Sequence, residues 1–287
     1  MSETGTRRAG VAGWPVGQSL SPVMHGFWIA EHRLNAEYSA LAIRPEDFPE
    51  EVKALAAKGY AGINVTIPHK EAAFRLSTAL DDDARATGAV NLLIFSDREI
   101  LGRNTDTVGF AAALDAALGE GAARNGPCVV LGAGGAARAV IVALARSGAK
   151  EIRILNRTHA RAVSTIDAVK TAESNIIARL NIFEWGDWNG AFSGAGLLVN
   201  TTSLGMTGKA ALDIPLDALP LSAGVGDIVY NPLQTELLRA AKARGHRTMD
   251  GLGMLMHQAV PAFEAWFGIR PKVTGELRKV LEEKLNG

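Results

Sequence analysis

The sequence is poor in cysteine and has no long apolar run, and each absence excludes a class of protein. Cys128 is the only cysteine in 287 residues, so no disulfide can form within the chain. It lies in an apolar stretch, which favours a small buried side chain over a nucleophile. No segment approaches the roughly 18 to 20 apolar residues of a membrane helix, and no apolar signal segment follows the basic pair near the N-terminus. We therefore expect a cytoplasmic protein without a membrane partner.

Net charge is also absent, because 30 basic residues balance 30 acidic ones. Without an excess positive field the chain has no general attraction for nucleic acid, so we expect no such partner. The six histidines show no ligand-like pairing with carboxylates or with one another, so no metal site is expected. Apolar residues make up 47% of the chain, enough for a sizeable core. The length favours two domains or one large one.

The first part of the chain alternates between strand-like and helix-like segments. We expect strands at residues 10–13, 37–43, 62–66 and 89–95, and helices at 21–34, 45–58, from about 69, and at 80–86. Strands that are separated by helix-length segments pair in parallel, so an α/β domain with a mainly parallel sheet is predicted. Ser21 followed by Pro22 is typical of a helix start, with Ser21 as a possible N-cap.

The second part has a more regular succession of strand, helix and strand. Strands are expected at residues 128–131, 151–155, 196–200 and 227–230, with a helix at 136–146. Residues 175–194 and 207–224 are less regular, and two helices are expected at 254–267 and 271–285. This order predicts a doubly wound, Rossmann-type domain.

A glycine-rich turn follows the strand at residues 128–131. Gly132 would permit the tight turn, and Gly134 would let the backbone approach a pyrophosphate at the N-terminus of the next helix. Glycines in a flexible loop are the alternative, but the strand before and the helix after favour dinucleotide binding. The predicted cofactor turn consists of Gly132, Ala133, Gly134, Gly135 and Ala136.

The end of the next strand selects between NAD and NADP. NAD sites usually place an acidic residue there, whereas this chain has Asn156, Arg157 and Thr158, with Arg161 one helical turn later. A guanidinium can hold a 2′-phosphate by charge-assisted hydrogen bonds, and an acid would repel it. Two solvated surface arginines are the alternative, and their position favours NADP.

Polar side chains of the first part gather where strands end, which is where open α/β sheets build pockets. Each has a plain structural interpretation as well: a helix cap for Ser21, an Asx turn for 104–106, and a surface lysine for Lys70. However, Lys70 lies at an expected helix start, where its charge opposes the helix dipole, so a functional reason for it is favoured. The candidates are Ser19, Ser21, Asn64, Thr66, Lys70, Asn91 and Asp106.

Taken in order, these segments resemble the shikimate dehydrogenase family. The matching segments run over residues 13–25, 64–70, 88–92 and 102–106, and continue over 132–136, 156–158, 200–206, 227–232 and 251–259. The resemblance implies that Ser19 and Ser21 bind a substrate carboxylate and that Lys70 and Asp106 are the catalytic pair. It implies that the ring hydroxyls are bound by Asn64, Thr66, Asn91, Asp106, Tyr230 and Gln258. The NADP site would add Arg157, Arg161, Ile228 and Gly251 to the glycine turn, with Asp82 a weaker candidate.

The same resemblance implies a domain division and a reaction. Residues 1–106 with 252–287 would form the substrate domain, and residues 107–251 the Rossmann domain. The implied reaction is the reversible reduction of 3-dehydroshikimate to shikimate with NADPH. The chain departs from the family pattern at Gln18, Leu92, Thr107 and Thr201, the first three near the expected substrate site.

Three other functions remain compatible with the same residues. The nearest is a dehydrogenase for quinate or another hydroxy acid at the same site. A methylenetetrahydrofolate dehydrogenase-like protein is more distant, because paired serines with Asn64 and Thr66 suit a small polar acid better than a pterin. A catalytically silent ligand sensor is the third, and retention of both Lys70 and Asp106 argues against it. A monomer and a homodimer are both compatible with the sequence.

Overall fold

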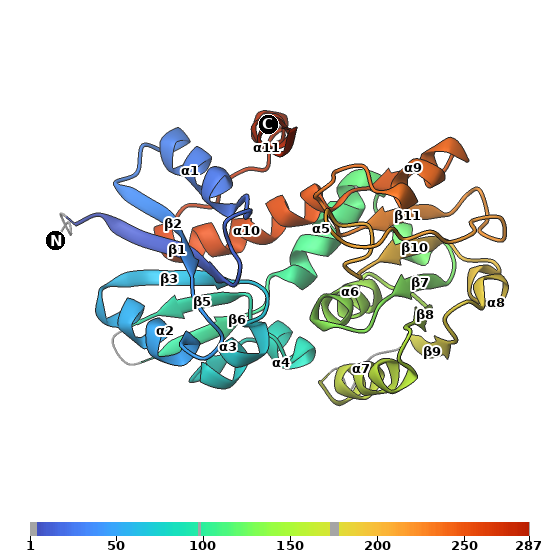
Figure 1. The fold of residues 1–287 in the computed structure, drawn as a ribbon, viewed down its shortest axis with the longest axis horizontal. Helices are drawn as coiled ribbons and strands as arrows, with labels where there is room; N and C mark the ends of the chain where they lie inside the picture. Colours follow the sequence, from blue (N-terminus) through green and yellow to red (C-terminus); the bar gives the residue numbers. More distant parts are fainter. Residues whose placement is uncertain (1–4, 97–98, 173–177, 287) are drawn as a thin grey trace. The chain divides into compact units, whose positions relative to one another are not determined.

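The computed structural model describes residues 5–96, 99–172 and 178–286 (Figure 1). The chain divides into two compact units. Unit 1 comprises the residues up to Thr105 together with Gln258 onward, and unit 2 comprises Asp106–His257. Each unit is built around its own six-stranded sheet.

The sheet of unit 1 has the strand order β2-β1-β3-β5-β6-β4. Its strands are β1 (Arg7–Gly13), β2 (Ala36–Ala42), β3 (Tyr60–Val65), β4 (Ala79–Leu80), β5 (Leu92–Phe95) and β6 (Ile100–Arg103). β1 pairs in parallel with β2 and β3, and β4 pairs in parallel with β6. β5 is antiparallel to both of its neighbours. The sheet is therefore mixed, with parallel pairs in the majority.

The antiparallel part arises from a hairpin that the hydrophobic pattern does not reveal. Only residues 96–99 separate β5 from β6, which is too short for the crossover that parallel strands need. Ser96 N–H donates to the carbonyl of Glu99 at 3.0 Å within this connection. β4 and β6, which no sequence pattern indicated, are short strands of two and four residues. Such short strands show too little alternation to be recognised.

The helices of unit 1 are α1 (Ser21–Glu31), α2 (Phe48–Ala57), α3 (Lys70–Leu76), α4 (Asp82–Thr87) and α11 (Gly275–Asn286). The expected N-cap role of Ser21 is wrong, because Leu20 is the N-cap and no side chain caps this helix. Ser21 is instead the first helical residue, and its N–H donates to Ser19 Oγ at 3.3 Å. Helix α10 (Gly251–Phe267) begins in unit 2 and ends in unit 1. Fully buried Trp28, Phe48 and Phe263 contribute to the core of unit 1.

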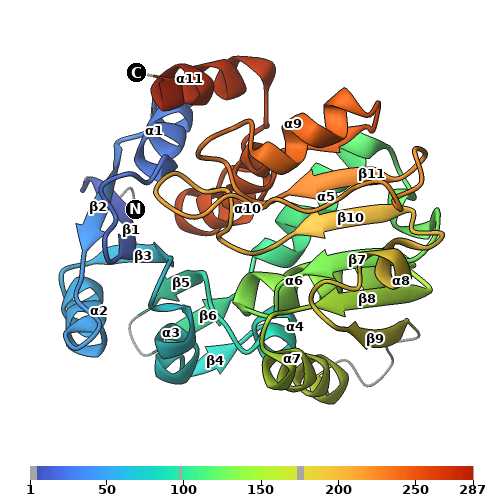
Figure 2. The ribbon, with the colours of Figure 1, turned by 45° about the vertical axis from the view of Figure 1, so that its right-hand side comes forward.

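The sheet of unit 2 is entirely parallel, with the strand order β12-β11-β10-β7-β8-β9. Figure 2 shows β11, β10, β7, β8 and β9 side by side. Its strands are β7 (Cys128–Leu131), β8 (Glu151–Leu155), β9 (Arg179–Phe183), β10 (Leu197–Asn200), β11 (Gly224–Asp227) and β12 (Thr248–Met249). The first strand, β7, lies at the centre and the chain winds outward in both directions, which is the Rossmann arrangement. The predicted doubly wound fold is confirmed.

The helices of unit 2 are α5 (Asp106–Leu118), α6 (Gly135–Arg146), α7 (His159–Ala172), α8 (Trp188–Phe192) and α9 (Glu236–Ala243), with a short 3-10 turn at Ala122–Arg124. The strand expected at 227–230 is misplaced, because β11 ends at Asp227 and the next residues form a loop. The region expected to be irregular contains both β9 and α8, whereas residues 175–177 lie outside the described residues. No helix in the described ranges is long and apolar enough to cross a membrane.

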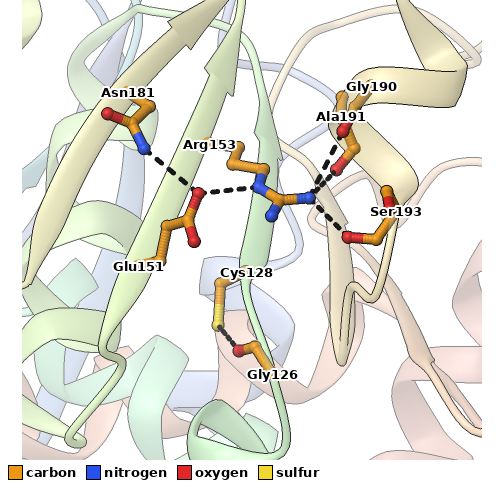
Figure 3. A network of polar contacts seen from close by, with 8 residues as sticks. All are labelled: Gly126, Cys128, Glu151, Arg153, Asn181, Gly190, Ala191 and Ser193. Atoms are coloured by element: carbon orange, nitrogen blue, oxygen red, sulfur yellow. Dashed lines mark hydrogen bonds and ion pairs between the residues drawn. The ribbon is translucent and has the colours of Figure 1, made fainter.

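Arg153 of β8 links this strand to the end of helix α8 (Figure 3). Arg153 Nη1 donates to the carbonyls of Gly190, Ala191 and Ser193 at 3.3, 2.9 and 2.7 Å. Its Nε donates to Glu151 Oε1 at 2.9 Å. The guanidinium therefore satisfies the carbonyl end of the short helix α8, where a positive charge also complements the helix dipole.

Candidate active site

The glycine turn between β7 and α6 has the geometry of a phosphate-binding loop. Gly132 has φ +112°, a conformation that residues with a Cβ rarely adopt. A Cβ on Gly132 would also lie 2.7 Å from Thr201 Oγ1. The turn is held by Gly132 N–H, which donates to the Leu155 carbonyl at 2.8 Å, and by Thr201 Oγ1, which donates to the Leu131 carbonyl at 2.6 Å. Glycine is therefore required at this position by the fold itself.

Gly134 differs from Gly132 because its backbone angle does not require glycine. Its notable feature is the space around it. It is the N-cap of α6, no side chain caps the helix there, and a Cβ at this position would meet nothing within 4 Å. Helix α6 thus begins at a residue that has no side chain and has room beside its Cα. Helix N-termini of this kind bind anions through their N–H groups and the helix dipole.

The end of β8 carries the residues expected to select NADP. Asn156 Nδ2 donates to the Thr158 carbonyl at 2.8 Å, which shapes the turn into α7. Arg157 is exposed, and its guanidinium carbon lies 5.4 Å from the centre of the Trp185 ring. Arg161 N–H donates to the Thr158 carbonyl at 3.0 Å, so Arg161 lies in the first turn of α7 with its side chain exposed. The two predicted arginines therefore flank one strand-to-helix turn.

The loop after β11 is ordered by a buried carboxylate. Asp227 is fully buried, and it accepts hydrogen bonds from Val229 N–H at 3.0 Å, Thr235 Oγ1 at 2.8 Å and Asn200 Nδ2 at 3.0 Å. Burial raises the pKa of Asp227 to about 6, and the three hydrogen bonds oppose that rise. This arrangement fixes the positions of Ile228 and Tyr230, which directly follow on the same loop.

Gly251 closes against this loop, since its N–H donates to the Val229 carbonyl at 3.3 Å. A Cβ on Gly251 would lie 2.2 Å from the Ile228 carbonyl oxygen, so only glycine fits. The glycine turn, Asn156 and Ile228 each follow the carboxyl end of a parallel strand in one sheet. Doubly wound sheets bind dinucleotides at that edge.

In unit 1, the candidate amides form a hydrogen-bonded group around Asn91. Thr105 N–H donates to Asn91 Oδ1 at 2.8 Å, and Asn91 Nδ2 donates to Thr105 Oγ1 at 3.0 Å. Asn91 Nδ2 also donates to Gln258 Oε1 at 3.3 Å, and Thr105 Oγ1 lies 3.4 Å from the same oxygen. Asn91 and Gln258, which are both expected to bind the substrate and lie 167 positions apart in the chain, are thus hydrogen-bonded to each other.

Asn64 joins the same group from the end of β3. Its Nδ2 donates to the Asn91 carbonyl at 3.2 Å, and its Oδ1 accepts a hydrogen bond from the Tyr38 hydroxyl at 2.7 Å. Asn64 and Asn91 are both buried, so their amides are oriented by these partners and not by solvent. Tyr38 was not predicted as part of the site. A tyrosine at an inward position of an alternating strand looks like ordinary core packing, so the sequence carries no signal for it.

Lys70 lies at the first position of α3, as expected, and is half-buried. Its carbonyl accepts a hydrogen bond from Val90 N–H at 3.0 Å, which ties the lysine backbone to the segment that leads into Asn91. The preceding His69 is buried, bonds through Nε2 to the Ile43 carbonyl at 2.8 Å and stacks on Phe48. The helix start that presents Lys70 is therefore anchored on both sides.

The remaining candidates are placed as follows. Ser21 is buried and Ser19 half-buried, and they are neighbours through the hydrogen bond to Ser19 Oγ. Thr66 follows β3, and its N–H donates to the Ala12 carbonyl at 2.9 Å.

Asp106 is buried at the start of α5, directly after Thr105 in the chain. Asp106 and Tyr230 belong to unit 2, and exposed Asp82 opens α4 in unit 1.

The described residues contain no cluster of side chains suited to a metal ion. Within residues 5–96, 99–172 and 178–286, no group of three or more His, Cys, Asp or Glu could hold a metal ion. Cys128 is buried, and desolvation raises the pKa of its thiol to about 12, so it is an unreactive core residue.

Comparison with known proteins matches this arrangement to one family. Residues 11–93 match the shikimate dehydrogenase substrate binding domain, 120–184 match shikimate/quinate 5-dehydrogenase, and 251–282 match the shikimate 5′-dehydrogenase C-terminal domain. A protein of Methylobacterium radiotolerans named shikimate dehydrogenase (NADP(+)) is 50% identical over 285 residues, which cover 98% of this chain and 99% of that one. The chain belongs to the shikimate dehydrogenase family.

Solved structures of the shikimate dehydrogenase family agree with the fold over nearly the full chain. Shikimate 5-dehydrogenase from Thermus thermophilus, in complex with NADP(H) and shikimate, is 34% identical with a TM-score of 0.83, covering 98% of both chains. Quinate dehydrogenase from Corynebacterium glutamicum, in complex with NAD, is 28% identical with a TM-score of 0.87 and covers 99% of this chain and 100% of that one. The predicted family and fold class are therefore confirmed.

Proposed function

We propose that this shikimate dehydrogenase family member catalyses the reversible reduction of 3-dehydroshikimate to shikimate with NADPH. The observation that carries the proposal is a hydrogen-bonded set in unit 1, in which the Asn91 carboxamide donates to the Gln258 carboxamide and the Asn64 carboxamide donates to the backbone carbonyl of Asn91. Oriented amides that are largely out of solvent suit a small ligand with several hydroxyl groups, because each amide offers both a donor and an acceptor. Ser19 and Ser21, which are linked by the hydrogen bond from Ser21 N–H to Ser19 Oγ, would bind the carboxylate of such a ligand.

The proposed reaction requires that the negative charge developing on the substrate's carbonyl oxygen be stabilised. NADPH, when bound, supplies a hydride to the ring carbonyl carbon. The ammonium group of Lys70 would stabilise the negative charge that develops on the carbonyl oxygen and would donate the proton to it. In the oxidation direction, neutral Lys70 would accept that proton. Asp106 would orient the substrate and the lysine by hydrogen bonding, while Thr66 and Tyr230 would contact ring hydroxyls.

Unit 2 would bind the cofactor at the carboxyl edge of its sheet. Gly132, Ala133, Gly134, Gly135 and Ala136 would receive the pyrophosphate, and Ile228 and Gly251 would line the nicotinamide half of the site. Arg157 and Arg161, with Asn156 and Thr158, would hold the 2′-phosphate of NADP. Asp82 stays a weaker candidate for the same site. Under this division, residues 1–106 with 252–287 bind the substrate and residues 107–251 bind the cofactor, in a cytoplasmic enzyme.

Quinate is the competing substrate, because the family includes a quinate dehydrogenase. The three departures from the family pattern differ in their surroundings. Gln18 is exposed, Leu92 is fully buried in β5, and Thr107 is buried with no hydrogen-bond partner for its Oγ1 among the described residues. Leu92 is therefore a core residue of unit 1. Of the three departures, Gln18 and Thr107 are the ones that would affect which substrate is bound.

A spectrophotometric screen of four combinations tests the proposal. Shikimate and quinate are each incubated with NADP and with NAD, and reduction of the cofactor is followed at 340 nm. The expected result is the highest kcat/KM for shikimate with NADP. A higher kcat/KM for quinate would replace the substrate assignment, and no turnover with any pair at saturating concentrations would support a ligand sensor.

A further inference from the structure

Tyr38 reaches the substrate amides from the edge of the unit 1 sheet. It lies on β2, opposite Ala9 of β1, whereas Asn64 lies on β3, opposite Val11 of β1. Residues side by side in parallel strands point to the same face, so Tyr38, Ala9 and Asn64 share one face. Two strand spacings, about 10 Å, separate β2 from β3. A phenol side chain is long enough to pass over the small Ala9 and reach Asn64.

The phenol ring is held by aromatic packing. His25 stacks on it with ring centres 4.0 Å apart and an interplanar angle of 3°. Trp266 lies 5.9 Å away, and His25 itself is fully buried against Trp28 and Phe263. Burial raises the pKa of Tyr38 well above its ordinary value, and a hydrogen bond with the Ser21 side chain opposes the rise, so at neutral pH the hydroxyl is protonated and able to donate.

The hydrogen bonds of Asn64 fix which way its amide faces. A backbone carbonyl can only accept, so the Asn64 atom next to the Asn91 carbonyl must be the nitrogen. Oδ1 therefore faces Tyr38, whose hydroxyl must donate to it, as the 2.7 Å distance indicates. With one N–H used by Asn91, the second N–H of Asn64 is available to an oxygen atom of a ligand.

We propose that Tyr38 is a positioning residue that holds the Asn64 carboxamide in its orientation for binding a substrate hydroxyl. The inference rests on the proposed function, because it takes Asn64 as a substrate contact. Tyr38 acts through Asn64, and its ring is kept in place by His25. Loss of the Tyr38 hydroxyl removes the 2.7 Å hydrogen bond to Asn64 Oδ1 and leaves the bond from Asn64 Nδ2 to the Asn91 carbonyl.

Tyr38→Phe tests this, since it removes the hydroxyl and keeps the ring that stacks on His25. The expected result is a rise of about 5- to 10-fold in the KM for shikimate, the size of one lost hydrogen bond. kcat and the KM for NADP are expected to stay within about twofold of wild type. Tyr60→Phe is the matched control, because Tyr60 lies at the start of β3 under Arg8, and it should leave all three values unchanged. An unchanged shikimate KM in Tyr38→Phe would overturn the inference.

A double-mutant cycle separates positioning from independent binding. If Tyr38 acts through Asn64, the Tyr38→Phe/Asn64→Ala double variant has the same shikimate KM as Asn64→Ala alone. If the KM of the double variant instead rises by the product of the two single-variant effects, Tyr38 contributes independently. That result would overturn the proposed role. If Tyr38→Phe does not fold, His25→Leu provides the test, because it removes the stacked ring and keeps the hydroxyl. It should raise the shikimate KM without changing the KM for NADP, and equal effects on both would contradict the inference.

The wild-type protein distinguishes the two possible failures. Wild-type protein that does not oxidise shikimate refutes the proposed function. Wild-type protein that is active, together with a fully active Tyr38→Phe variant, refutes only the role of Tyr38.

Discussion

The guanidinium of Arg157 lies over the ring of Trp185, with 5.4 Å between the guanidinium carbon and the ring centre. Arg157 follows β8 and Trp185 follows β9, so neighbouring strands of the unit 2 sheet supply the two partners. A cation–π contact of this kind restricts the arginine without using its N–H donors. The donors of Arg157 thus stay available for a phosphate.

Trp185→Ala is therefore expected to weaken NADP binding without touching the phosphate directly. An exposed cation–π contact contributes about 0.5–1 kcal/mol, which corresponds to a 2- to 5-fold rise in the KM for NADP. Arg157→Ala should have a larger effect, about 10-fold or more, because it removes charged hydrogen bonds. Steady-state kinetics with NADP and NAD in the same preparations provide the check. An equal rise with NAD would mean that the pair serves the fold and not the 2′-phosphate.

Lys70→Ala is expected to lower kcat by about 100-fold or more, the range of general acid–base catalysis. The KM for NADPH should remain within twofold, because Lys70 is assigned to the substrate oxygen. Lys70→Arg is the matched variant that keeps the charge. Equal losses in kcat and in NADPH affinity for Lys70→Ala would contradict the catalytic assignment.

Two glycines of the cofactor turn are expected to respond differently to alanine. Gly132→Ala should lower thermal stability by several degrees, because its φ is +112° and its Cβ would lie 2.7 Å from Thr201 Oγ1. Gly134→Ala should leave the melting temperature unchanged, because nothing lies within 4 Å of its Cβ. It should nevertheless weaken NADP binding, since the added methyl group would occupy space next to the helix N-terminus. Thermal melting and NADPH titration of both variants test this, and normal NADP affinity in Gly134→Ala would place the pyrophosphate elsewhere.

His25 is expected to make the protein sensitive to acid. Burial lowers its pKa from 6.5 to about 3. Below pH 6.5 the unfolded chain therefore binds a proton that the folded chain does not, so the free energy of unfolding decreases as the pH falls toward 3. At pH 5 the loss is about 2 kcal/mol by this linkage. The Asn64 side chain opposes this lowering of the pKa, and His25→Phe removes the titrating ring while keeping an aromatic side chain in its place.

Urea unfolding at pH 7 and pH 5 measures this effect. The wild type should lose stability between the two pH values by more than the His25→Phe variant does. Asp227 works in the opposite direction, because its raised pKa, about 6, lets the folded state hold a proton that the unfolded chain has released. That contribution is present in both proteins and cancels in the comparison. The exposed His159→Asn is the control, and a pH response identical to wild type in His25→Phe would contradict the prediction.

The sequence predicted the parts of the fold that depend on local pattern. β7 and β8 were placed to the residue, because buried parallel strands that are followed by glycine or asparagine have clear limits. The β5–β6 hairpin was missed, because four-residue strands carry too little periodicity. β11 was placed too late because Ile228 and Val229, although apolar, belong to the loop ordered by Asp227.

For the candidate site, the sequence indicated the residues whose chemistry is distinctive. The lysine, the aspartate, the arginines and the glycine turn could be identified from type and position along the chain. The link from Tyr38 to Asn64 could not, because it crosses a strand between positions 26 residues apart. The bond between Asn91 and Gln258 likewise depends on the return of α10 to unit 1, which no local pattern encodes.

The three-residue group of Asn91, Thr105 and Gln258 also limits how this enzyme could change during evolution. Each member is hydrogen-bonded to the other two, so replacing one removes a partner from both of the others. Drift to a new substrate through these positions would require coordinated changes, whereas exposed Gln18 could vary alone. We expect changes of substrate specificity in this lineage to begin at exposed positions such as Gln18. Changes at Asn91, Thr105 and Gln258 should come last.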